Sequence, residues 1–84
     1  MILTMILQAV AGAGLAKFGA IMGVGIAVFG ASFGIGSIGK SAMDAIARQP
    51  EAANDIRSSM LVAAALIEGA VLFAVVVGIL VIFM

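Results

Sequence analysis

Two long stretches with almost no charge constrain the fold of this 84-residue chain more than any other feature of its sequence. Residues 18–39 contain no charged side chain, and residues 58–84 contain a single one, Glu68. A helix needs about 20 apolar residues to cross the hydrocarbon core of a bilayer, so both stretches are long enough. A soluble domain of this length could not bury a chain that is 65% hydrophobic. The sequence therefore predicts an all-α membrane protein, folded as an antiparallel hairpin of two transmembrane helices.

The remaining charges gather between the two stretches. Six of the other seven charged side chains lie within residues 40–57. Pro50, the single proline, cannot continue a helix from its N-terminal side, but it fits the first turn of a new one. We therefore expect one domain, with a first helix over residues 4–47, a loop over 48–50 and a second helix over 51–83. The membrane parts of the two helices would be residues 18–39 and 58–83.

Positive charge indicates how the hairpin is oriented. Lys40, Arg48 and Arg57 lie on the loop side, whereas Lys17 alone lies on the other side. The positive-inside rule then predicts a cytoplasmic loop with both termini outside. Residues 1–16 lack the basic start of a signal peptide, so we favour an outer extension of the first helix over a cleaved segment. No transit peptide is evident, which favours a bacterial inner membrane.

Small residues recur along the first helix at intervals of three or four and form two faces. The first face consists of Gly19, Gly23, Ala27, Gly30, Gly34, Ser37 and Ser41, and the second of Gly25, Ser32, Gly36 and Gly39. Small faces let helix backbones approach closely in lipid. The second helix of the same chain can cover only one of them, so the other is free for a copy of the chain. Spacing alone leaves a closed ring and a tight dimer equally open.

Glu68 is the candidate functional residue, because it is the only charge in its stretch and lies about 5 Å from the middle of it. An ionised carboxylate there costs about 2.5–3.5 kcal/mol on insertion scales. Desolvation therefore favours the neutral acid, which can ionise where a partner offers positive charge. A permanently neutral Glu68 that bonds helices together is the alternative. We favour a carrier, because Gln or Ser would form such bonds without an ionisable group.

Several other classes of site are excluded. The chain has no Cys and no His, which removes disulfides and the usual zinc ligands. Its formal net charge of zero, without a basic patch, argues against nucleic acid. Gly39-Lys40-Ser41 resembles the end of a nucleotide-binding loop, but it closes an apolar helix and follows no strand. We therefore expect no metal and no catalytic residue.

Three features together resemble the c subunit of F-type ATP synthase, the proteolipid of the rotor ring. They are the glycine-rich first helix, the loop Ala47-Arg48-Gln49-Pro50-Glu51-Ala52, and a lone carboxylate eighteen residues after the proline. The resemblance extends from Gly19 to Phe83. It implies a homo-oligomeric ring in membrane lipid, with the first helix inside and the second outside. It also implies a protein that needs no cofactor and is not an enzyme on its own.

The resemblance also implies roles for individual residues. Glu68 would be the proton-binding carboxylate, loaded and unloaded through two half-channels of the a subunit, whose arginine would hold the ionised form. The residues expected to line this site are Gly30, Ala31, Gly34, Ile35, Leu66 and Gly69. Arg48, Gln49 and Pro50 match the loop that contacts the central stalk, formed by the gamma and epsilon subunits.

The transported ion follows from the same comparison of positions. Sodium-binding members carry a glutamine at the position of Ile35 and hydroxyl residues after the carboxylate, where this chain has Gly69, Ala70 and Phe73. Because a hard cation requires several oxygen ligands, we expect H⁺ and disfavour Na⁺.

Three other interpretations of the hairpin explain less of the sequence. A V-type proteolipid resembles a doubled hairpin, whereas this chain has one. A small pore former such as a holin or viroporin would explain the hairpin but not the spacing from the Arg-Gln-Pro loop to the carboxylate. A small structural subunit without transport would leave Glu68 unexplained.

Overall fold

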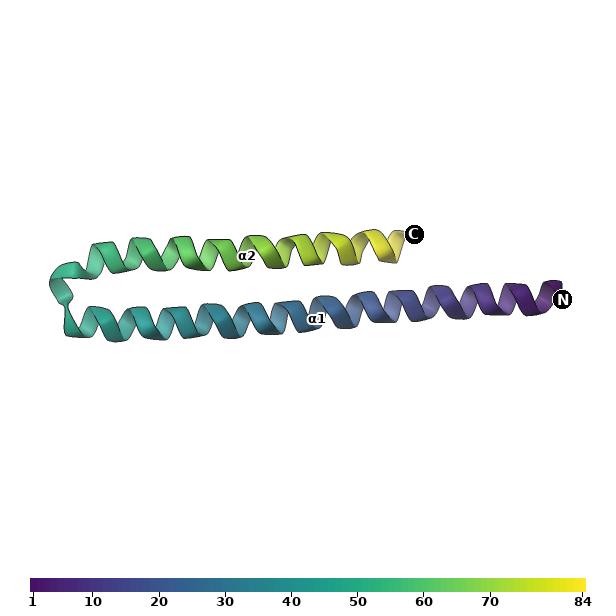
Figure 1. Cartoon of the computed structure of the whole chain (residues 1–84), viewed down its shortest axis with the longest axis horizontal. Coiled ribbons are helices and arrows are strands. Elements are labelled where there is room, and N and C mark those ends of the chain that lie inside the picture. Colours follow the sequence, from purple (N-terminus) through teal and green to yellow (C-terminus); the bar gives the residue numbers. More distant parts are fainter.

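The computed structural model describes all 84 residues and consists of two long helices side by side (Figure 1). Helix α1 spans Ile2–Arg48, the short 3-10 helix η1 spans Pro50–Ala52, and helix α2 spans Ala53–Phe83. The molecule is a rod with extents of 73 × 16 × 9 Å. The predicted all-α hairpin is confirmed, and both helices are long and apolar enough to cross a membrane.

The turn between the helices is very short. The residue before a proline avoids α geometry, and Gln49 accordingly has φ −133° and ψ 73°. Its N–H donates a hydrogen bond of 2.9 Å to the Ala45 carbonyl, and its own carbonyl accepts one of 3.0 Å from the Ala52 N–H. Arg48 ends α1 and Pro50 begins η1, so Gln49 is the only residue between these two helices. The fixed φ of proline lets a new helical turn begin at once.

At two points along the seam between α1 and α2, a glycine of one helix lies against a larger apolar side chain of the other. Gly78 of α2 lies against Val24 of α1, so closely that a Cβ atom at position 78 would overlap Val24 Cγ2. Nearer the turn, a Cβ atom at Gly34 would lie 3.4 Å from Ile67 Cδ1. These two pairs define the antiparallel register of the hairpin.

The hairpin has almost no interior. Only Ala42 and Gly78 are buried, and large apolar side chains such as Phe29, Phe33 and Phe73 are more than 70% exposed. Of the 77 backbone hydrogen bonds, 72 lie within helices, so the backbone polar groups are satisfied as a lipid environment requires. An apolar surface of this extent has to be covered by lipid or by other protein.

Candidate functional site

Glu68 lies near the middle of α2 on the exposed surface of the hairpin. Arg57, the nearest basic residue of α2, is eleven residues away, or about 16 Å along the axis. The register places Lys40 of α1 about 10 Å away along the same direction. The carboxyl group of Glu68 therefore has no basic side chain of its own chain at the same depth. The structure also contains no group of three His, Cys, Asp or Glu side chains that could hold a metal ion.

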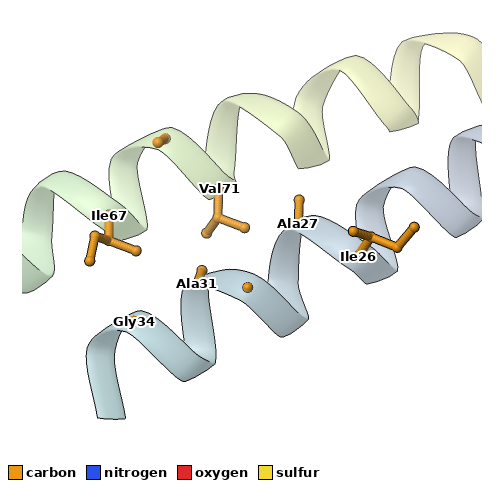
Figure 2. Close-up of a pocket in the computed structure, with 8 residues that line it drawn as sticks. Ile26, Ala27, Ala31, Gly34, Ile67 and Val71 are labelled. Atoms are coloured by element: carbon orange, nitrogen blue, oxygen red, sulfur yellow. The ribbon is translucent and has the colours of Figure 1, made fainter. Parts of the chain in front are cut away.

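A groove between the helices lies at nearly the same depth as Glu68. Figure 2 shows Ile67 and Val71 of α2 facing Gly34, Ala31 and Ala27 of α1 across it. The full lining consists of Ile26, Ala27, Gly30, Ala31, Gly34, Ile67, Ala70 and Val71. The groove is thus apolar, and small side chains keep it open.

Helix geometry assigns the groove and Glu68 to opposite sides of the hairpin. Successive residues of a helix are rotated by about 100°. Ile67 faces α1, Ala70 is about 60° to one side of it, and Glu68 is about 100° to the other. The groove that contains Ala70 therefore runs along one side of the hairpin, and Glu68 lies on the other.

The two sides differ in character along their length. Further grooves follow the side of Ala70, one containing Ser41 and Ser59 and another containing Gly23 and Val77. We call this side the small-residue flank, defined by Gly23, Gly30, Gly34 and Ser41 of α1. The opposite side, defined by Glu68 and Ser32, is the Glu68 flank. Ser32 belongs there because it lies about 160° around α1 from Gly34.

The expected lining residues are distributed between these sides and the seam. Gly30, Ala31 and Gly34 line the groove together, and Ile35 is half-buried. Leu66 is 71% exposed, and a Cβ atom at Gly69 would meet nothing within 4 Å. The structure thus brings Gly30, Ala31 and Gly34 together, but within one chain it does not bring them to Glu68.

Ser32 is a candidate site residue that sequence reasoning does not single out. Its hydroxyl group lies on the Glu68 flank, within about 2 Å of the depth of Glu68 along the helix axis. In the sequence, Ser32 is notable only as a member of the second small-residue face. That pattern does not indicate that Ser32 lies near the carboxyl group of Glu68.

The residues of the expected stalk-contact loop form the exposed tip of the hairpin. Arg48, Gln49 and Pro50 are all exposed, and Glu51 follows them in η1. The tip thus presents charged and polar groups at the end of an otherwise apolar rod.

Comparison with known proteins decides the family. The sequence profile that describes the C subunit of ATP synthase matches residues 18–81, which is more than half of the chain. The chain belongs to the ATP synthase c subunit family. The resemblance noted in the sequence is therefore confirmed. As an ATP synthase c subunit, the chain is a membrane proteolipid of the c-ring, a rotor component of the complex that is not an enzyme on its own.

Individual relatives resemble this c subunit along most or all of its length. The ATP synthase c subunit of Azobacteroides pseudotrichonymphae is 69% identical over 77 residues, which cover 92% of this chain and 94% of that protein. The c subunit of Bacteroides fragilis is 65% identical over 85 residues, and that of Phocaeicola vulgatus is 57% identical over 84 residues, each over the whole of both chains. No solved structure shows a significant match.

Proposed function

We propose that this c subunit carries protons, one on each Glu68, as the c-ring turns. The observation that carries the proposal is an exposed carboxyl side chain on an apolar helix, with no cation of its own chain at the same depth. An ionised carboxylate at this depth costs about 2.5–3.5 kcal/mol on insertion scales, and a neutral acid does not carry that cost. A carboxyl group that travels through lipid as the neutral acid and ionises beside a cation is suited to pick up and release a proton.

The ring geometry provides a place for the neutral acid. In a closed ring, one side of each copy meets the opposite side of the next. The Glu68 flank of one copy would then face the small-residue flank of its neighbour. Because all copies share one orientation, Glu68 would lie against the groove of Gly30, Gly34 and Ala70 at nearly the same depth. The groove is lined by apolar side chains and glycines, so it can accept an uncharged side chain without a counter-ion.

The change of Glu68 between the neutral acid and the charged carboxylate would couple proton flow to rotation of the ring. Glu68 would take up a proton in one half-channel of the a subunit, travel through lipid as the neutral acid, and release the proton through the other. An arginine of the a subunit would hold the ionised carboxylate in between. One charge that crosses 100 mV supplies about 2.3 kcal/mol, so the ring must add up several protons for each ATP formed.

The composition of the site favours H⁺ over Na⁺. Ile35 and Gly69 offer no side-chain oxygen where a sodium site would need one, and Ser32 is the only hydroxyl residue on the Glu68 flank near the depth of Glu68. A carboxylate and one hydroxyl are too few oxygens for a hard cation that has lost its water.

The exposed tip would connect the ring to the central stalk. Arg48, Gln49 and Pro50 lie at the end of the rod, where the gamma and epsilon subunits could dock without contact with lipid. The excess of Lys and Arg at this end favours a cytoplasmic tip with both termini outside. The membrane would be the bacterial inner membrane, as the Bacteroides relatives also suggest.

Replacement of Glu68 by glutamine tests the carrier role. Glutamine preserves size and polarity but cannot exchange a proton, so proton-driven ATP synthesis in membrane vesicles should be lost while the intact ring keeps its mass in detergent. Asp44→Asn is the matched control, because it makes the same carboxylate-to-amide change at an exposed position outside the apolar stretches and the tip, and it should leave synthesis intact. ATP synthesis that survives Glu68→Gln would reject the proposal.

A chemical modification tests the choice of ion. A hydrophobic carbodiimide reacts with the protonated carboxyl group, and mass spectrometry of the chain would locate the product on Glu68. Sodium should leave the rate of modification unchanged, since no sodium ion competes with the proton. Protection by sodium at constant pH would show that the site binds Na⁺.

A further inference from the structure

The N-terminal part of α1 extends well beyond the end of α2. Gly78 lies against Val24, so six residues further along α2 the C-terminal Met84 is level with Phe18 of α1. Residues 2–17 therefore form an overhang of about 24 Å with no part of α2 beside it. Figure 1 shows this purple end of α1 projecting past the C-terminus.

The overhang is apolar and uncovered. Its large apolar side chains, each more than half exposed, are Ile2, Leu3, Met5, Ile6, Leu7, Val10 and Leu15. It carries no charged side chain before Lys17. Residues 58–84 of α2 already span about 40 Å, which exceeds the roughly 30 Å hydrocarbon core of a bilayer. The overhang therefore continues past the core on the side of the termini, where a bare apolar helix is unfavourable.

In the c-ring, the overhang of each copy always has the overhang of the next copy available to cover its apolar surface. All copies in a ring have the same orientation, so their overhangs lie at the same level and side by side. The face of α1 that carries Gly23, Gly30 and Gly34 on the small-residue flank continues without a break into the overhang through Gly12 and Ala16. The interface between copies within the membrane is thus continuous with a matching surface outside it. Relatives such as the Bacteroides fragilis c subunit align over the whole chain, overhang included.

We propose that residues 2–17 of neighbouring copies pack against one another and form a helical collar beyond the membrane part of the ring. The inference rests on the ring of the proposed function and extends its interface beyond the end of α2. The collar places apolar side chains such as Met5 and Leu7 between neighbouring helices, whereas Ile6 points in the same direction as Val24, the side that α2 covers within the membrane. Thr4 and Gln8 are its polar groups.

Disulfide cross-linking tests the collar, and the absence of native cysteine makes the test clean. A disulfide forms only where two Cα atoms lie within about 7 Å of each other. The pair Gly12→Cys with Gly14→Cys puts one thiol on each of the two sides that neighbouring copies present to one another. The pair Gly23→Cys with Gly25→Cys is the matched control within the membrane. It lies eleven residues further on, and its two positions point in the same directions to within about 20°.

Oxidation of membranes that contain either double variant should give a ladder of cross-linked oligomers on a non-reducing denaturing gel. Each single variant should give no ladder, since a head-to-tail interface joins two different surfaces. If Gly12→Cys impairs insertion, Ala16→Cys with Gly14→Cys replaces it on the same two sides.

The outcomes separate the collar from the ring. A ladder from the membrane pair without one from the overhang pair would overturn the collar and leave the ring standing, with the overhang covered by lipid or another protein. Dimers from Gly12→Cys alone would overturn the collar in favour of a two-fold contact. No ladder from either pair would count against the ring itself, and so against the proposed function.

Discussion

Replacement of Gly78 by alanine tests how closely the two helices of the hairpin pack. A Cβ atom at this position would overlap Val24 Cγ2 of α1, and Gly78 is one of only two buried residues. A Cβ atom at Gly69 on the same helix would meet nothing within 4 Å. We therefore expect Gly78→Ala to push α1 and α2 apart near their open end, whereas Gly69→Ala should leave their separation unchanged.

The magnitude follows from the packing of the seam. The preference of a helix for alanine over glycine has no effect here, because α2 is helical whether the hairpin is closed or open. An extra methyl group in a packed seam costs about 1–3 kcal/mol, and Val24 cannot easily turn aside because valine has one strongly preferred χ1 rotamer in a helix. The closed hairpin should thus lose about 1–3 kcal/mol, or roughly 5- to 150-fold in its population relative to an open form.

A second substitution should remove this effect. Val24→Ala removes the atom that Gly78→Ala would overlap. In that background Gly78→Ala should leave the population of the closed hairpin nearly unchanged. Loss of the effect in the second background is the mark of direct contact between positions 24 and 78.

Pulsed electron resonance distances give the measurement. Spin labels on cysteines introduced at the exposed positions Phe18 and Phe83 would report the separation of the helices at the open end of the solubilised chain. Gly78→Ala should lengthen and broaden the distance distribution, and the addition of Val24→Ala should restore it. An unchanged distribution for Gly78→Ala, or no recovery with Val24→Ala, would refute the close packing of the seam.

Three further predictions concern the tip, the open end and the orientation. Arg48→Glu at the tip should abolish ATP-driven proton pumping, measured by fluorescence quenching in inverted vesicles, while ATP hydrolysis continues; normal pumping would argue against a stalk contact. Lys17→Glu should speed amide hydrogen exchange in the last turn of α2 by about 2- to 5-fold, because a cation near a helix C-terminus is favourable and an anion is not; equal exchange would mean that Lys17 does not act on that end. An impermeant maleimide should label Met84→Cys from outside intact cells and Asn54→Cys only in inverted vesicles, and the reverse pattern would contradict the proposed orientation.

The hairpin itself could be predicted from the sequence because its causes are local. Residues 18–39 and 58–84 are apolar over lengths that only a membrane accommodates, and Pro50 forces an interruption between them. One difference lies in the start of the second helix. The sequence predicts a second helix from residue 51, whereas η1 forms a 3-10 turn over Pro50–Ala52 before α2 begins at Ala53. The Ala52 N–H donates a hydrogen bond to the Gln49 carbonyl three residues back, which is the bond of a 3-10 turn.

The arrangement of the candidate site could not be predicted, because it depends on the register between the helices. The sequence does not show which of the eleven glycines contact the other helix. The structure shows that Gly78 lies against Val24 and Gly34 against Ile67. Without that register, Gly30, Ala31 and Gly34 could be expected beside Glu68 but could not be assigned to the opposite side of the hairpin. Ser32 could not be connected to the carboxyl group for the same reason.

The near absence of buried residues has a consequence for how this c subunit tolerates change. Only Ala42 and Gly78 are shielded within one chain, so most other side chains are available to lipid or to a neighbouring copy. A surface substitution in a monomeric protein usually changes stability by no more than about 0.5 kcal/mol. A substitution on either flank of this hairpin changes every interface between neighbouring copies in the ring. Its effect on the free energy of assembly is therefore multiplied by the number of interfaces. A substitution on either flank should therefore weaken assembly of the ring more than the same substitution weakens the folding of a monomeric protein.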